Sequence, residues 1–122
     1  MNKNKNPIWD FVSFHQKRFQ ELAYKVWSTP ETCYTEKLSM GAHADELRYH
    51  GFSVTKGIAN IPTAVVGEYG TDGPVIAFLG EYDALAGLSQ KADQFYQEPI
   101  KKGENGHGCG HNLLGSASMQ AA

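Results

Sequence analysis

The chain has 122 residues, of which 41% are hydrophobic, and its formal net charge is −2. This length fits one domain at most, and the nearly balanced charge gives no electrostatic case for binding nucleic acid or an anionic membrane surface. No stretch approaches the length of a membrane-spanning helix. With only two cysteines, Cys33 and Cys109, there is no disulfide framework, which suits a reducing compartment. We therefore expect a cytoplasmic globular protein that binds neither nucleic acid nor membranes.

The amino-terminal part predicts a long helix. Residues 1–6 are basic but lack the apolar core of a secretory signal, so we expect no export. Apolar residues then repeat at three- and four-residue intervals from Ile8 to Trp27. This spacing predicts one helix that begins at Pro7 and ends near residues 28–30.

A second helix is expected from about Glu36 to His50, with Gly51 as a left-handed cap. Its inward residues would be Met40, Ala44 and Leu47, and its solvated face would carry Asp45, Glu46 and Arg48.

Three strands are predicted to follow, over residues 52–56, 63–69 and 74–79. The last is a continuous apolar run after a glycine turn at residues 70–73, which is typical of a strand buried on both faces. Residues 88–106 are polar and predict a loop, and residues 116–122 have the composition of a helix cut in its interior. The elements together predict an α/β fold in which two amino-terminal helices cover a mixed sheet.

The most informative motif lies near the end of the chain and reads His107-Gly108-Cys109-Gly110-His111-Asn112. In an extended segment, side chains at alternate positions share one face, and the glycines between them leave the backbone free to turn around a small ion. Thiolate and imidazole are ligands that zinc prefers. The cluster therefore predicts a metal site, although a single cysteine or histidine is usually a packing residue.

A second motif follows the third predicted strand and reads Gly80-Glu81-Tyr82-Asp83-Ala84-Leu85. Ligands in open α/β sheets sit beyond the carboxyl ends of the strands. Glu81 and Asp83 are therefore candidates for metal-site chemistry, with an exposed acidic loop as the alternative. We expect these two acids to converge with Cys109 and His111.

Together the two motifs resemble the zinc aminoacylase and carboxypeptidase family of metallopeptidases. Within it, the chain is most similar to the amidohydrolase branch that includes hippurate hydrolase, the auxin-conjugate hydrolases and, nearest, the aminobenzoyl-glutamate hydrolases. The resemblance implies that Cys109 and His111 bind metal and that Asp83 is the acidic residue that orients a metal-bound histidine. Glu81 stands where other branches carry histidine or aspartate, which leaves its role open, and His107 is not expected to be a ligand.

The resemblance also implies a mechanism and an extent. Family members hydrolyse amide bonds with a pair of divalent cations, zinc or manganese. The substrates implied are N-acyl amino acids, aminobenzoyl-glutamate or small dipeptides. Members are several times longer, so residues 1–122 are expected to be the amino-terminal part of an α/β/α catalytic domain of the zinc-exopeptidase type. That part would lack the general base and the dimerisation domain, and the complete protein would be a homodimer or hetero-oligomer.

Three hypotheses remain open from the sequence. The chain is the first part of a metal-dependent amidohydrolase that is inactive alone, or a metal-binding module without catalysis, or a structural fragment whose glycine-rich segment is disordered.

Overall fold

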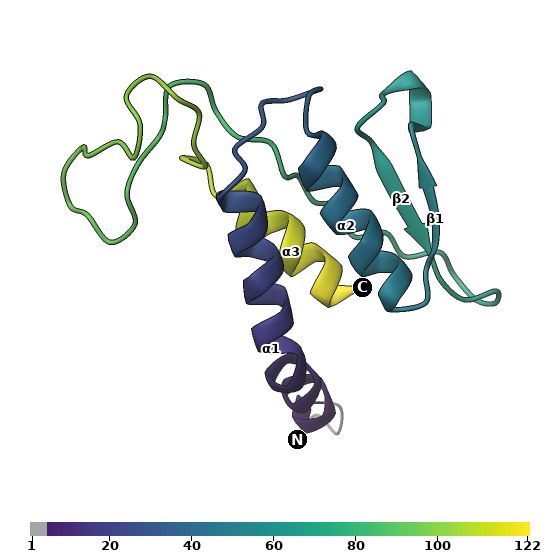
Figure 1. The fold of residues 1–122 in the computed structure, drawn as a ribbon. Coiled ribbons are helices and arrows are strands. Elements are labelled where there is room, and N and C mark those ends of the chain that lie inside the picture. Colours follow the sequence, from purple (N-terminus) through teal and green to yellow (C-terminus); the bar gives the residue numbers. More distant parts are fainter. Residues whose placement is uncertain (1–4) are drawn as a thin grey trace.

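The computed structural model describes residues 5–122 and contains three α-helices, one short 3-10 helix and one small sheet (Figure 1). The elements in chain order are α1 (Lys5–Trp27), α2 (Lys37–Tyr49), β1 (Ser53–Lys56), η1 (Ile58–Asn60), β2 (Val65–Glu68) and α3 (His111–Ala121). Residues 1–4, part of the basic segment from which we expect no export, lie outside the described residues. Among the described residues, no helix is both long and apolar enough to cross a membrane.

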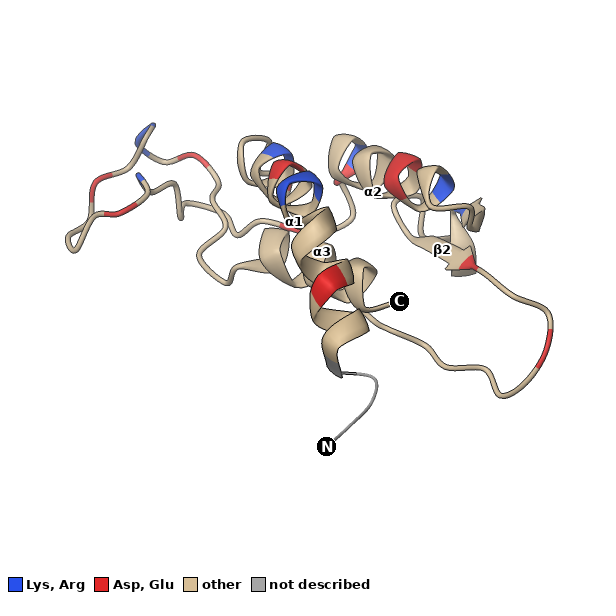
Figure 2. Cartoon of the chain, turned by 90° about the horizontal axis from the view of Figure 1, so that it is seen from below, with Lys and Arg blue, Asp and Glu red and all other residues tan. Residues whose placement is uncertain are grey.

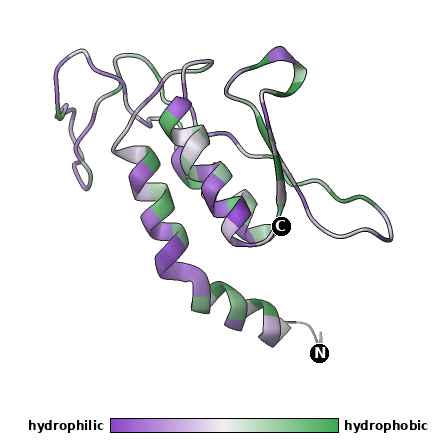
Figure 3. Cartoon of the chain, turned by 45° about the vertical axis from the view of Figure 1, so that its right-hand side comes forward, coloured by the Kyte–Doolittle hydropathy of each residue, from purple (hydrophilic) through white to green (hydrophobic). Residues whose placement is uncertain are grey.

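Helix α1 confirms the long helix predicted from periodicity. Its carboxyl-terminal half buries Phe19, Leu22 and Val26, and the helix packs against both α2 and α3. Its amino-terminal half projects beyond the other helices (Figure 3). The apolar side chains of Ile8 and Trp9 in this half are each 58% exposed. One face of α1 is therefore only partly covered by the described chain.

Helix α2 and its cap were also predicted correctly. Gly51 has a φ of +86°, a left-handed conformation that favours glycine. Its N–H donates to the Arg48 carbonyl, and the N–H of Phe52 donates to the Leu47 carbonyl, each at 3.0 Å. These are the two hydrogen bonds of a Schellman motif, which satisfies carbonyls at the end of a helix.

The predicted solvated face of α2 was wrong at one residue, Glu46. Its side chain is buried, and it pairs with Arg18 of α1 and, at 3.0 Å, with His50. The guanidinium of Arg18 also lies over the Tyr49 ring, 3.4 Å from its centroid. Glu46 thus belongs to the interface between α1 and α2 because an arginine from a distant part of the sequence faces it.

Two of the three predicted strands form, and they pair with each other. Strands β1 and β2 are antiparallel, with Ser53 opposite Glu68 and Lys56 opposite Val65. Residues 74–79, predicted as a buried strand, form no strand in the described structure, and Val75 is 97% exposed. The chain is mixed α/β as predicted, but its sheet has two antiparallel strands instead of a mixed arrangement. The apolar run has no neighbouring strand within residues 5–122 to pair with.

Candidate functional site

The candidate site is built from an extended segment, residues 79–85, that crosses the start of α3. The segment is anchored beyond the site by backbone hydrogen bonds. The Ala84 N–H donates to the Glu31 carbonyl at 2.7 Å, and Leu85 exchanges hydrogen bonds with Gly106 at 2.9 and 3.0 Å. Ala84 is only 2% exposed. These contacts fix the carboxyl-terminal end of the segment, directly after the two acidic residues.

The other half of the site is the first turn of α3. Gly110 precedes the helix with a φ of +77°, and its carbonyl accepts the N–H groups of Leu113 and Leu114. The backbone reverses at this glycine, so His111 is the first helical residue. Helix α3 itself contains no Asp, Glu, Lys or Arg, whereas α1 and α2 carry charges of both signs (Figure 2).

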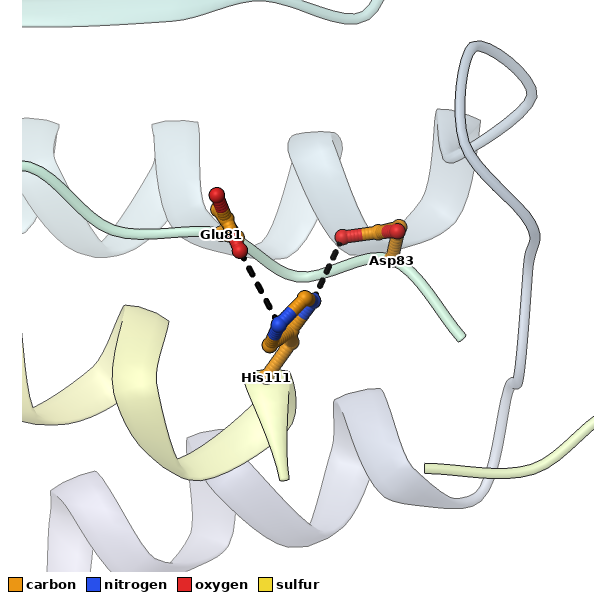
Figure 4. A group of neighbouring side chains, drawn as sticks. All are labelled: Glu81, Asp83 and His111. Atoms are coloured by element: carbon orange, nitrogen blue, oxygen red, sulfur yellow. Dashed lines mark hydrogen bonds and ion pairs between the residues drawn. The ribbon is translucent and has the colours of Figure 1, made fainter. Parts of the chain in front are cut away.

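Glu81, Asp83 and His111 come together at this crossing (Figure 4). Nδ1 of His111 lies 2.7 Å from Oδ1 of Asp83, and Nε2 lies 3.0 Å from Oε2 of Glu81. The three atoms that could bind a metal ion, one from each residue, all lie within 4.8 Å of one another. The side chains of His111 and Asp83 are mostly covered, at 17% and 21% exposed, whereas that of Glu81 is 61% exposed. The group therefore opens to solvent on the side of Glu81.

The His111 ring makes one hydrogen bond, to Asp83, and lies at ion-pair distance from Glu81. Asp83 accepts the Nδ1–H of His111, so in a neutral ring Nε2 would present a lone pair to the Glu81 carboxylate. A cation held between this nitrogen and the Glu81 carboxylate, which lie 3.0 Å apart, would be attracted by both lone pairs. An imidazole whose other nitrogen is held by a carboxylate, together with a second carboxylate, is a donor set that suits zinc or manganese.

Tyr82 points to the opposite side of the segment because side chains alternate along an extended chain. Its hydroxyl donates to the Thr63 carbonyl, and its ring packs against His43 of α2 at a centroid distance of 4.9 Å. Burial, with a smaller contribution from the Glu36 carboxylate, raises the pKa of Tyr82 to about 12. Tyr82 is therefore a neutral anchor on the inner side of the segment.

His43 is buried, and its Nδ1–H donates to the Ser39 carbonyl at 3.0 Å. Burial lowers the pKa of His43, so the ring is neutral and its Nε2 carries a lone pair. Within the described structure this nitrogen has no hydrogen-bond partner. Neither His43 nor Tyr82 was predicted as part of the site, since a single histidine on a helix or a single tyrosine carries no distinguishing pattern.

The predicted site residues separate into two groups. The structure brings together Asp83, His111 and Glu81, whose role the sequence had left open. Cys109 is exposed and is not part of this group of described residues, so its predicted convergence with the acids does not appear, while its role as a ligand stays a prediction. His107 turns toward α1, where its Nε2–H donates to the Val26 carbonyl at 3.1 Å. The expectation that His107 is not a ligand stays a prediction.

Comparison with known proteins finds a relative among the hydrolases. Over 115 residues the chain is 47% identical to a subunit of p-aminobenzoyl-glutamate hydrolase from Escherichia coli (strain K12). The chain is similar to one part of this hydrolase subunit. The match takes in 94% of the chain but 24% of the relative, so the chain spans about a quarter of the relative's length. No protein-family model matches the chain. The resemblance to the aminobenzoyl-glutamate hydrolases predicted from the two motifs is confirmed.

Proposed function

We propose that this chain supplies part of the active site of a metal-dependent amidohydrolase that cleaves p-aminobenzoyl-glutamate. The observation that carries the proposal is the Asp83–His111–Glu81 group, which lies in the two motifs that resemble the metallopeptidases. The similarity to a hydrolase of that name supports the substrate. Because the chain spans about a quarter of that relative, we infer that it is inactive alone.

Each site residue has a distinct role in this proposal. His111 holds a divalent cation through Nε2, and the Asp83 carboxylate fixes the ring by accepting the Nδ1–H. Glu81 adds negative charge on the open side, and Cys109 is the expected thiolate ligand. When bound, zinc or manganese supplies Lewis-acid activation of the amide carbonyl and of a water molecule.

The proposal also includes a cytoplasmic location and assembly with other subunits. Both cysteines are free and exposed, as in proteins of the cytoplasm, where thiols stay reduced. The relative is named as a subunit, which supports assembly of the complete protein into a hetero-oligomer. The small acidic substrate would approach from the open side of the His111 ring.

The test is a chimera in which this chain replaces the matching segment of the Escherichia coli relative, expressed with the other components of that hydrolase. We expect release of p-aminobenzoate and two bound metal ions per chimeric subunit. His111→Ala and Cys109→Ala should each abolish hydrolysis and lower metal content, whereas Cys33→Ala should change neither. Cys33 is the matched control because it is also free and exposed but lies outside both motifs.

Two outcomes would contradict the proposal. Full activity of the Cys109→Ala chimera with metal retained would mean that the thiol is not a ligand. Metal binding without hydrolysis in the unmutated chimera would favour a non-catalytic metal-binding role for this chain.

A further inference from the structure

One face of α3 runs along the segment that carries the two acids. His111, Gly115 and Ser118 are spaced four and three residues apart, so they lie on the same side of the helix. His111 contacts the side chains of Glu81 and Asp83, and the Ser118 hydroxyl donates to the Leu79 carbonyl at 2.7 Å. Residues 79–83 therefore run antiparallel to α3 and are bound to it at both ends.

Between these two ends the backbones approach closely. A Cβ atom added at Gly115 would lie 2.6 Å from the Glu81 carbonyl oxygen and 2.8 Å from Nε2 of His43. A Cβ added at Gly80 would lie 3.0 Å from the Gly115 Cα. Only glycine fits at Gly115 without displacing the segment, because the nearest atom is backbone.

A glycine inside a helix is unfavourable by itself. It loses more conformational freedom on folding than alanine, and it adds no side chain to the core. The sequence nevertheless has Gly115 in the middle of α3, one turn after His111. The close approach to Glu81 gives a physical reason for this residue.

The far side of the segment is held as well. Tyr82 is anchored to the Thr63 carbonyl and packs on His43, so the segment cannot move away from α3 without breaking these contacts. The segment thus lies between α2 and α3. Its distance from α3 determines whether the carboxylates of Glu81 and Asp83 reach His111.

We infer that Gly80 and Gly115 are positioning residues, which set the spacing between residues 79–83 and α3 so that Asp83 and Glu81 hold the His111 ring. This inference deepens the proposed function, on which it rests for the role of the ring in metal binding. The positioning itself does not depend on a metal. It can therefore be tested on the 122-residue chain without one.

The test compares Gly115→Ala with Gly41→Ala, which is the matched control. Both glycines lie inside helices, but a Cβ at Gly41 would meet nothing within 4 Å. Alanine favours both helices equally through propensity. Any difference between the two variants therefore reports the contact of residue 115 with the segment.

The first readout is the ring-nitrogen NMR signals of His111 in the metal-free chain. In the unmutated chain and in Gly41→Ala we expect the signature of a ring whose Nδ1–H is hydrogen-bonded to the Asp83 carboxylate. In Gly115→Ala we expect the signals of a solvent-exposed, averaging ring, with helix content unchanged by circular dichroism. The second readout is zinc affinity of the same samples, which should fall at least tenfold in Gly115→Ala and stay unchanged in Gly41→Ala.

Gly80→Ala provides a second variant for the case in which Gly115→Ala fails to fold. It disturbs the contact between α3 and residues 79–83 from the other side, because its Cβ would lie 3.1 Å from the Ser118 Cβ. We expect the same change in the His111 signals, but smaller. Unchanged His111 signals in a folded Gly115→Ala or Gly80→Ala chain would overturn the inference. If the unmutated chain does not bind zinc although its His111 signals are as expected, the result would count against the proposed function alone.

Discussion

The two halves of the extended segment at residues 74–85 contrast sharply. Residues 74–79 are almost all apolar, yet Val75, Ile76 and Leu79 are 97%, 74% and 84% exposed. Residues 80–85 carry two acids and a tyrosine, yet Tyr82 and Asp83 are partly buried and Ala84 is buried. Composition alone would assign the buried and exposed parts the other way round.

The difference lies in what each half has to contact. An apolar strand gains free energy only when a sheet neighbour or a helix covers it. Residues 5–73 and 86–122 provide no such cover for residues 74–79. The second half instead meets α3 on one side and α2 on the other, where hydrogen bonds and glycine contacts hold it. Specific contacts thus hold residues 80–85 in place, independently of their hydrophobicity; we call residues 80–85 the held half and residues 74–79 the exposed half.

The largest effect is expected from a charge placed in the held half. Ala84→Asp would bury a carboxylate at a site that is 2% exposed and that holds an uncharged side chain in the unmutated protein. We expect a loss of about 3–5 kcal/mol in the free energy of unfolding. Urea unfolding followed by circular dichroism measures this loss.

Val75→Asp is the control for Ala84→Asp, because it places the same charge in the exposed half. It should change the free energy of unfolding by less than about 0.5 kcal/mol. Equal losses in the two variants would mean that the contrast between the two halves does not exist in solution.

The next effect concerns Asp83. Asp83→Asn keeps the size of the side chain but loses the negative charge that contacts the His111 ring at 2.7 Å. Zinc affinity measured by competition with a chromogenic chelator should fall about ten- to a hundredfold. Asp93→Asn, in the loop between Leu85 and Gly106, is the matched control and should leave zinc affinity unchanged. A similar loss in both variants would indicate a general effect of charge instead of the Asp83–His111 contact.

An element of this structure could be predicted from the sequence when the residues that specify it lie close together along the chain. Helix α2 and its Gly51 cap were predicted because periodicity and a glycine are local signals. The Asp83–His111 pair was within reach because both residues sit in recognisable motifs. The strand at residues 74–79 was wrong because a strand needs a partner that the pattern does not contain.

The residues that were missed share one property. Glu46 is buried by Arg18, which is 28 residues away, and His43 meets Tyr82, a residue of a different element. The importance of Gly115 arises from the Glu81 carbonyl, which comes close only after folding. Such contacts follow from three-dimensional packing, so no local spacing reveals them.

A pH effect should distinguish the two halves further. Burial lowers the pKa of His43, which lies beneath the held half, from its usual value of 6.5. As the pH falls below about 6.5, the unfolded chain binds a proton at His43 that the folded chain binds less readily. The free energy of unfolding should therefore decrease from pH 7 to pH 5, by at most about 1.4 kcal/mol per pH unit from this group.

Urea unfolding of the unmutated chain and of His43→Asn across this range isolates the contribution of His43. Asparagine can still donate to the Ser39 carbonyl but does not titrate, so the slope should become shallower. His107, whose pKa is also lowered by burial, should account for part of the remaining slope. Burial raises the pKa of Glu31, but the hydrogen bonds that its carboxylate accepts from the Leu38 and Ser39 N–H groups outweigh this, and the pKa is lowered. The stability that Glu31 contributes is therefore lost only at more acidic pH, below about 4.5. An identical slope in both chains would mean that His43 is not buried in the neutral form.

The smallest effect on stability is expected in the apolar half. Ile76 is 74% exposed, so Ile76→Lys should change the free energy of unfolding by less than about 0.5 kcal/mol. It should nevertheless reduce self-association, because the backbone N–H and C=O groups of residues 74–78 have no partner among the described residues and are open to a second copy. Sedimentation velocity over a range of protein concentrations measures the association, with Lys91→Ala in the polar loop as the control. A stability loss above about 1 kcal/mol would instead show that residues 74–79 are covered in solution, so that the two halves of the segment are held alike.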